Sequence, residues 1–326
     1  GDHRVVEIPK ALWWIILHGI ILRTRPKKSA EKYASIWTPD GSPLKVWTAK
    51  QATLLRGFLG ERGHHTTVRY AMRYGNPSIP DVLDQLKAEG HSRILILPLY
   101  PQYSGTTTAS VFDAVYGWAA RLRSIPELRF VNRYHDHAGY INALARSITA
   151  HWQAHGRPDK LVMSFHGVPE RTRTLGDPYH DECKETTRLL VQRLGLREDQ
   201  YVQTFQSRFG KAQWLQPYTQ PTVEALAQSG VKRIDVVCPG FTSDCLETLE
   251  EINMEVREAF LHAGGQEFHY IPCLNDSNAW ITALSQVAQQ HLAGWPTTVP
   301  DAAALADAHA RALAGGAPAG ACPMSK

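Results

Sequence analysis

The sequence predicts an α/β protein made of two similar Rossmann-like halves, each a parallel β-sheet flanked by helices. Two observations lead to this prediction. Short apolar runs rich in β-branched residues alternate with helix-length segments, and the two halves of the chain share a repeated pattern. Strands that alternate with helices indicate parallel sheets with right-handed crossovers. A chain of 326 residues, 43% of them apolar, can fill one large or two medium cores.

Seven apolar runs have the composition of buried strands. They cover residues 66–72, 93–100, 128–134, 160–165, 201–207, 233–239 and 268–274. Helices are expected where apolar residues recur every three or four positions and a glycine stands at or near the end. The clearest such segments are residues 80–90, 181–195, 222–230 and 244–265.

A faint internal repeat relates the two halves. "MRYG" at 72–75 precedes "LYPQYSGTTT" at 99–108, and "SRFG" at 207–210 precedes "VCPGFTSDCLE" at 237–247. The second copy contains four predicted strands and the first contains three. We therefore expect two four-stranded units related by a pseudo-twofold axis, with the opening strand of the first unit missing. Either another molecule supplies that strand or the N-terminus is incomplete.

The repeat divides the chain into two expected units. The first α/β unit combines residues 1–100 with 270–295 and carries an apolar lip. The second unit covers residues 101–269, and an Ala- and Gly-rich tail follows at 296–326.

Composition argues against several classes of function. The net charge of +4 is spread along the chain without a long basic run, so no nucleic-acid partner is indicated. The sequence has no Gly-rich phosphate-binding motif, so nucleotide binding is not supported. Five cysteines without a C-x-x-C pair indicate free thiols in a reducing compartment, and hence a cytoplasmic location.

The most apolar stretch, "ALWWIILHGIIL" at 11–22, leads directly into "RTRPKK" at 23–28. It falls well short of the roughly 20 residues that a membrane-spanning helix needs. It is either a core helix with a solvated end or an apolar lip. Such a lip would rest its basic edge on a membrane surface or take in an apolar, anionic ligand.

Two side chains near the ends of predicted strands could carry chemistry. His166 follows the strand at 160–165, and Glu247 lies in the first turn of the helix after the strand at 233–239. Ligands of doubly wound sheets bind beyond the carboxyl ends of the strands. A neutral imidazole with a carboxylate suits Fe(II), Zn(II) or Co(II). A structural histidine and a solvated acidic face are the alternatives.

The acidic face continues along the same predicted helix. Glu251 and Glu255 follow Glu247 at intervals of four residues, and no Lys or Arg partner appears along the chain until Arg257. Aromatic and cationic residues also lie in the strand-end loops. They would suit a flat, largely apolar ligand with carboxylates at its rim, although plain packing would also explain them. These residues are Arg73, Tyr100, Tyr103, Tyr179, Trp214 and Phe241.

Four long strings resemble the ferrochelatases of Gram-negative bacteria, over nearly the whole chain to about residue 293. They are "YPQYSGTTTAS" (100–110), "SFHGVPERTRTLGDPY" (164–179), "QSRFGKAQWLQP" (206–217) and "CPGFTSDCLETLEEI" (238–252). The resemblance implies two chelatase-type domains that insert Fe(II) into protoporphyrin IX to form protohaem, the last step of haem biosynthesis.

The resemblance also assigns roles to individual residues. It implies that His166 and Glu247 are the opposed catalytic and metal-binding pair, and that Glu251 and Glu255 conduct metal or protons. The residues that it places at the porphyrin pocket are Arg73, Tyr100, Tyr179, Trp214 and Phe241. The stretch Trp13 to Leu22 matches a pocket lip that touches the membrane, which implies peripheral contact at the inner membrane face.

The chain departs from the family pattern in two places. Ferrochelatases normally open with a strand and loop close to L-V-N-L-G-T-P, and this chain begins after it. Some members bind a [2Fe-2S] cluster through C-terminal cysteines, but Cys322 stands alone in its tail and Gly105 occupies the other cluster position. We therefore predict no cluster, with Fe(II) as the substrate metal.

Three other functions remain open at this stage. A coproporphyrin ferrochelatase or a cobalt chelatase would share the fold and the histidine. A haem or porphyrin carrier without catalysis would need an axial ligand but no opposing carboxylate, so the pair of His166 and Glu247 argues against it.

Overall fold

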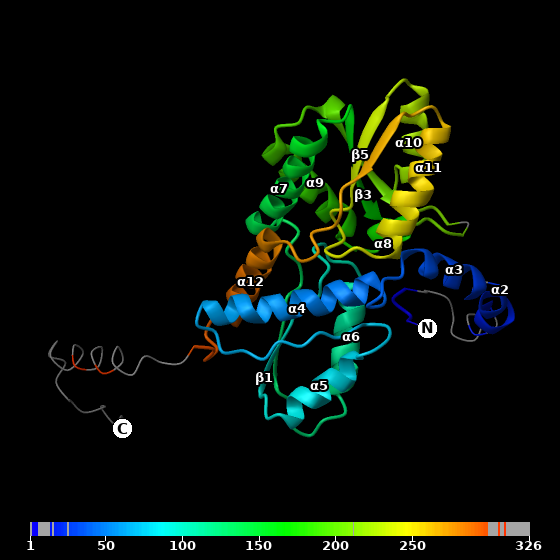
Figure 1. Ribbon diagram of the computed structural model, residues 1–326. Helices are drawn as coiled ribbons and strands as arrows, with labels where there is room; N and C mark the ends of the chain where they lie inside the picture. The colour runs from blue at the N-terminus through cyan, green and yellow to red at the C-terminus, as the bar shows by residue number, and fades with distance from the viewer. Residues whose placement is uncertain are drawn as a thin grey trace.

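The computed structural model describes residues 2–5, 14, 16–24, 26–210, 212–298, 306 and 310. Its described strands form two parallel sheets (Figure 1). β1 (Arg93–Ile96) pairs with β2 (Glu127–Phe130) in the first sheet. The second sheet has the order β4-β3-β5-β6. Its strands are β3 (Lys160–His166), β4 (Tyr201–Gln206), β5 (Arg233–Val237) and β6 (Glu267–Tyr270). The predicted α/β class with parallel sheets is confirmed.

Helices cover both faces of the second sheet (Figure 1). α7 (Ala138–His155) and α9 (Tyr179–Leu194) lie on one face, and α10 (Thr219–Gln228) and α11 (Arg257–His262) lie on the other. Side chains of β3 alternate between the two resulting cores: Met163 belongs to the first and Val162 to the second. A parallel strand buried on both faces is apolar throughout. This explains why the run at 160–165 is mostly apolar, with Lys160 at its start and the small, buried Ser164 as its only polar residues.

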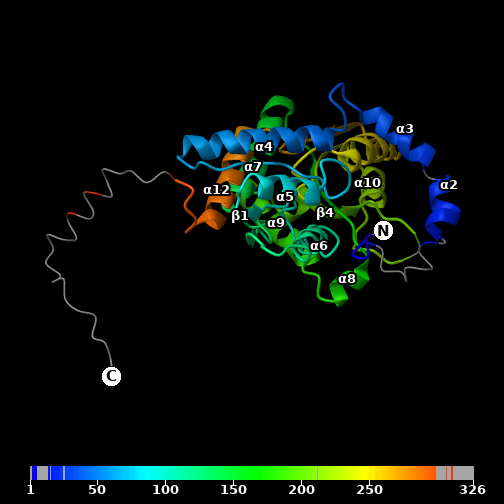
Figure 2. The same ribbon diagram turned by 90° about the horizontal axis from the view of Figure 1, so that it is seen from below.

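The remaining described helices complete the two units. α12 (Asn278–Leu292) packs against both α4 (Pro43–Glu61) and α7, and so joins the two units (Figures 1 and 2). The α-helices are α2 (Leu22–Thr24), α3 (Pro26–Ile36), α4 (Pro43–Glu61), α5 (Ile79–Ala88), α6 (Thr108–Ala119), α8 (Glu170–Thr174) and α12 (Asn278–Leu292). Two π-helices, η1 (Leu17–Ile21) and η3 (Glu247–Val256), and one 3₁₀ turn, η2 (Glu198–Gln200), are also present.

Matching backbone contacts support the predicted internal repeat. Met72 N donates to Pro77 O in the loop before α5, and Phe205 N donates to Pro217 O in the loop before α10. Residues 66–72 are therefore the counterpart of β4.

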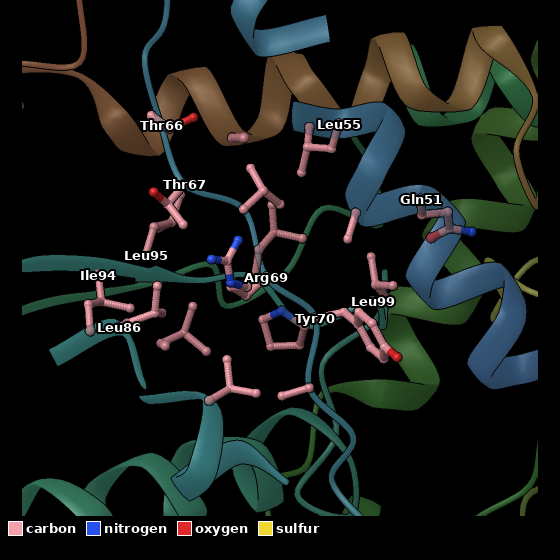
Figure 3. Close-up of a pocket in the computed structure, with 18 of the residues that line it drawn as sticks. Gln51, Leu55, Thr66, Thr67, Arg69, Tyr70, Leu86, Ile94, Leu95 and Leu99 are labelled. Carbon is pink, nitrogen blue, oxygen red and sulfur yellow. The ribbon is translucent and has the colours of Figure 1, made fainter. Parts of the chain in front are cut away.

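Residues 66–72 nevertheless form no strand, so this part of the sequence prediction is wrong. In the second sheet, β3 lies between β4 and β5 and pairs with both. No described strand takes the corresponding central position in the first sheet, so residues 66–72 have no neighbouring strand with which to pair. A cavity of about 890 Å³ lies between this segment and β1 (Figure 3). The described part of the first sheet therefore has two strands instead of four.

The pairing of β1 with β2 also affects the expected boundary between the units. Because these strands hydrogen-bond, the first sheet continues across residues 100 and 101, where the sequence analysis placed the boundary. Most of the expected tail at 296–326 lies outside the described residues.

Candidate active site

His166 is the last residue of β3 and lies in register with Gln206 of β4. Its side chain is half-buried, and its Nδ1 lies 2.6 Å from the carbonyl oxygen of Gly167. A carbonyl can only accept a hydrogen bond, so Nδ1 carries the proton of the neutral imidazole. Nε2 then keeps its lone pair and can accept a proton or bind a metal ion.

A close packing arrangement fixes the backbone beside His166. A Cβ atom on Gly167 would lie 2.7 Å from the carbonyl oxygen of Gln206 and 3.1 Å from the Trp214 ring. Gly167 N also donates to that carbonyl at 2.8 Å. Trp214 is only 5% exposed, and its ring meets that of Phe209 edge to face. Trp214 therefore supports the loop after β3 from behind.

Glu247 begins the π-helix η3, which follows β5 and its loop. π-helices are rare and are frequently found at functional sites. Gln206 ties this helix to the histidine strand: its Nε2 donates to Glu247 O at 2.7 Å, and its Oε1 accepts from Ser164 Oγ at 2.8 Å. Phe241 lies in the loop between β5 and η3. The centroid of its ring is 6.4 Å from that of the His166 ring.

Two tyrosines lie close enough to Glu247 to be affected by its charge. Burial raises the pKa of Tyr33, on α3, and the carboxylate of Glu247 raises it further. Burial likewise raises the pKa of Tyr100 to about 12, with contributions from Tyr74, Cys245 and Glu247. Tyr100 still exposes 37% of its area, because it lines the cavity.

The rest of the acidic stripe is already paired. Glu251 accepts hydrogen bonds from the backbone N and the hydroxyl of Ser207, both at 2.6 Å. Lys32 of α3 lies 2.8 Å from Glu250 and 2.7 Å from Glu255. The expectation that the stripe has no basic partner before Arg257 is therefore wrong, because α3 brings Lys32 to it. Burial raises the pKa of Glu250; Lys32 opposes this rise and Glu255 adds to it.

Arg73 already holds a carboxylate. Its Nε donates to Ser110, and its NH2 group donates to Asp2 Oδ2 at 2.7 Å. Tyr74 donates to the same oxygen at 2.7 Å. Burial alone would raise the pKa of Asp2, but hydrogen bonds from Ser110, Tyr74 and Arg4 and the charge of Arg73 lower it to about 2. This corner of the molecule can therefore stabilise an ionised carboxylate.

The cavity brings together only part of the set from the sequence. Arg73, Tyr100 and Phe241 line it, whereas His166, Glu247, Tyr179 and Trp214 are not among its lining residues. Its far part, lined by Leu86, Ile94 and Thr66, occupies the place that β3 has in the second sheet (Figure 3). The cavity therefore includes space that a central strand fills in the second sheet, and only the part lined by Arg73, Tyr100 and Phe241 carries residues of the predicted site.

Tyr179 belongs to the core behind the site. It is 7% exposed and packs with the residues under α7 and α9. A Cβ atom on Gly240 would lie 3.8 Å from its hydroxyl oxygen, so Tyr179 supports the loop that carries Phe241.

Several site residues escaped the sequence analysis. Gln51 of α4 donates to Thr242 O, Ser243 Oγ and Asn275 O, and so fixes the loop before η3. Asp244 is buried and accepts from Asn275 Nδ2 at 2.6 Å. Asp244 lies in the string "TSDCLE", which was a usable signal, but nothing local marks Gln51 or Gln206.

Solved structures with a similar fold define the class of protein. SirB from Bacillus subtilis with Fe3+ matches with a TM-score of 0.55 and 14% identity, over 78% of this chain and 92% of that one. CbiX, the terminal enzyme for biosynthesis of siroheme in denitrifying bacteria, matches with a TM-score of 0.52 and 13% identity, over 78% and 95%. The fold is therefore that of the chelatases.

Sequence comparison identifies the family within this class. The ferrochelatase family model matches residues 1–292. A ferrochelatase of Polaromonas sp. (strain JS666 / ATCC BAA-500) is 70% identical over 98% of this chain and 87% of its own length. That of Methylibium petroleiphilum is 68% identical over 94% and 84%. The chain belongs to the ferrochelatase family, whose members are lyases that insert iron into porphyrin.

Two further expectations concern groups outside this site. None of the described helices is long and apolar enough to cross a membrane. Gly105 N donates to Asp177 Oδ2 at 2.7 Å, and Cys322 lies outside the described residues. The expected absence of a [2Fe-2S] cluster remains a prediction.

Proposed function

We propose that this enzyme inserts Fe(II) into protoporphyrin IX to form protohaem, with His166 and Glu247 as the reacting pair. The observation that carries the proposal is the connection through Gln206. This side chain lies in register with His166 and donates to the first residue of η3, so one residue positions the imidazole strand and the carboxylate helix together.

Porphyrin metallation sets the chemical task. Two pyrrole protons must leave, and the ring must bend so that a nitrogen lone pair points out of its plane. Part of the free energy of binding at the porphyrin rim is used to distort the ring, which costs a few kcal/mol. His166 Nε2, which keeps its lone pair, accepts a pyrrole proton or hands over the metal. Glu247 balances the charge on the opposite side.

The acidic stripe provides a route between this pair and the surface. Glu251 is half-buried and held by Ser207, whereas Glu255 exposes half of its side chain and contacts Lys32. Carboxylates whose exposure increases from the site towards the solvent can pass protons or Fe(II) from one to the next. We assign this role to Glu251 and Glu255.

The rim of the substrate would be held in the part of the cavity that Arg73 lines. Arg73 already stabilises a carboxylate, and a porphyrin carries carboxylates at its edge. Tyr100 and Phe241 line the same cavity and would pack on the flat ring. Trp214 and Tyr179 are buried and would act on the substrate through the loops that they support.

Replacing the histidine tests the proposal. For His166→Ala we expect a fall in kcat of at least about 100-fold, the lower range for loss of an acid–base group, with porphyrin affinity within about threefold of wild type. Porphyrin fluorescence quenching measures both quantities. His262→Ala, an exposed histidine on α11, should behave as wild type. Near-normal haem formation by His166→Ala would refute the assignment.

The same assay settles the choice of substrate. Protoporphyrin should be metallated at least about tenfold faster than coproporphyrin, and Fe(II) should be preferred to Co(II). Equal or reversed preference would identify the enzyme as a coproporphyrin or cobalt chelatase. Stoichiometric instead of catalytic haem yield would identify a carrier.

We also propose that the segment from Trp13 to Leu22 touches a membrane surface. Trp14 exposes 62% and Leu22 exposes 51% of its area, and α2 projects from one end of the molecule (Figure 2). Exposed apolar side chains next to the exposed Arg23 suit an anionic lipid surface. Trp13 itself lies outside the described residues.

Vesicle co-sedimentation tests this contact. The double variant Trp14→Glu/Leu22→Glu should bind phosphatidylglycerol vesicles at least about threefold less than wild type. Leu175→Glu/Leu261→Glu, which adds the same charge at two other exposed apolar residues, should bind as wild type. Equal loss in both variants would show that only net charge matters.

A further inference from the structure

Three histidines gather on the second unit, away from the loops that carry His166 and Glu247. His151 and His155 lie one turn apart at the end of α7, and His269 lies in the edge strand β6. Each of the three offers a ring nitrogen, and these nitrogens all lie within 4.8 Å of one another. The rings of His151 and His155 are stacked at 4.3 Å. The proposed function uses none of these residues.

Hydrogen bonds direct two of the imidazoles so that their lone pairs are available. His155 Nδ1 lies 3.1 Å from the carbonyl of His151, so it carries the proton and leaves Nε2 unprotonated. His269 Nε2 lies 2.7 Å from a carboxylate oxygen of Glu267, so its Nδ1 keeps the lone pair. A carboxylate behind an imidazole is the usual support of a metal-bound histidine.

The third imidazole has a carboxylate beside the nitrogen that faces His269, and not behind its ring. His151 Nε2 lies 3.2 Å from His269 Nδ1 and 3.6 Å from Asp235 Oδ2, and Asp235 is fully buried. Burial lowers the pKa of His151, and the charge of Asp235 opposes this shift. A neutral imidazole is the form that binds metal.

The charges around the cluster leave it net negative. Asp235 and Glu267 contribute two negative charges, and Arg233 contributes one positive charge through contacts with both at 3.3 and 3.4 Å. A divalent cation would therefore enter a site whose fixed charge is −1.

We propose that His151, His155 and His269 bind one divalent first-row transition ion of the Zn(II) type, with water in the fourth position. Imidazole donors suit Zn(II), Co(II), Ni(II) and Cu(II) rather than Mg(II) or Ca(II). Zinc–nitrogen bonds of 2.0–2.1 Å at tetrahedral angles place two ligand nitrogens about 3.3 Å apart. The nitrogens of His151 and His269 already stand 3.2 Å apart. His155 is exposed and can rotate to complete the set.

The bound ion would tie the end of α7 to the edge strand β6. The ion would be separate from the proposed iron-handling pair. His166 ends the central strand β3, whereas His269 of this cluster lies in the edge strand β6, two strands away in the sheet. A metal-loaded site of this kind should raise the thermal stability of the second unit.

Titration with Co(II), which gives visible absorption in a tetrahedral nitrogen site, tests the proposal. Wild type, His166→Ala and His262→Ala should each show the band, with one equivalent bound at the histidine cluster. His155→Ala should lose at least about tenfold in affinity for this equivalent, with its metal-free melting temperature unchanged because His155 is exposed. Zn(II) should raise the melting temperature of wild type but not of His155→Ala.

A rescue variant makes the test specific. His155→Cys should restore Co(II) binding and add a thiolate-to-cobalt charge-transfer band, because Cys is also a ligand for such ions. The four cysteines among the described residues are buried and should not contribute this band. Co(II) binding by His155→Ala equal to wild type, or binding lost only in His166→Ala, would overturn the proposal.

Discussion

Next to His166, two atoms leave no room for a side chain. A Cβ added to Gly167 would lie 2.7 Å from the carbonyl oxygen of Gln206, which is too close, and 3.1 Å from the ring of Trp214, which is tight. The first contact is with backbone, which cannot move without disturbing the pairing of β3 with β4. Gly167 therefore holds the imidazole in place by being small.

Gly167→Ala should consequently shift the end of β3. We expect a loss of stability of about 1–3 kcal/mol, typical of overpacking, and a fall in kcat of at least about tenfold because His166 is displaced. Urea denaturation and the porphyrin fluorescence assay measure the two effects.

Gly57→Ala is the matched control for this change. Nothing lies within 4 Å of an added Cβ on Gly57, which is an interior residue of α4, one turn before its end. It should gain about 0.5–1 kcal/mol of stability and keep full activity. If Gly167→Ala were as active and as stable as this control, the positioning role of the close contact would be disproved.

At the scale of elements, the helix after β5 differs from its sequence prediction. Apolar spacing predicted one α-helix over 244–265, but the chain forms a π-helix at Glu247–Val256 and then α11. In a π-helix the hydrogen bonds join residues five apart, so Glu250 and Glu255 stand on adjacent turns. One lysine, Lys32, reaches both. α3 is thereby attached to the acidic stripe.

Lys32→Met should destabilise the protein by about 1 kcal/mol at neutral pH. The pKa of Glu250 is raised in the folded state, so folding favours its protonated form. The stability linked to this group is complete below its unfolded pKa and is lost as the pH rises through its folded pKa. Without Lys32 that pKa rises further, so the deficit of the variant should grow between pH 5 and pH 7.5.

Denaturant titrations at both pH values measure this deficit. Lys27→Met, which removes an exposed lysine from the same helix, should show little change at either pH. A deficit of Lys32→Met that is constant with pH, or equal to that of Lys27→Met, would exclude the linkage.

These cases show what local sequence could and could not predict. The strand before His166 and the positions of His166 and Glu247 were predictable, because the carboxyl ends of parallel strands meet at one edge and the runs before these residues are mostly apolar. Lys32 was not, since its partners are more than 200 residues away in the chain. The segment 66–72 has strand composition, but a strand also needs a neighbouring backbone, and no described strand provides one.

At the scale of the whole molecule, the two units are unequal. In the second, β3 pairs with β4 over residues 161–166 and with β5 over residues 160–163, so each of its residues has at least one neighbouring strand. In the first, β1 is paired only with β2 among the described strands, and its other edge faces the cavity. Backbone groups at such an edge depend on solvent for their hydrogen bonds. The first unit should therefore open locally at a lower free energy than the second.

Amide hydrogen exchange should reveal this difference directly. Ile96 O accepts a hydrogen bond from Val131 N, so the backbone N–H and C=O groups of Ile96 point towards β2. Because these groups alternate along a strand, those of Leu95 point to the other edge of β1, which borders the cavity. Peptides covering residues 92–99 should exchange at least about tenfold faster than peptides covering 160–166. β6, an edge strand of the second sheet, should fall between them, because it lacks a partner on one side but does not line the cavity that β1 borders. Equal protection of β1 and β3 would mean that the open edge leaves the first unit as stable as the second.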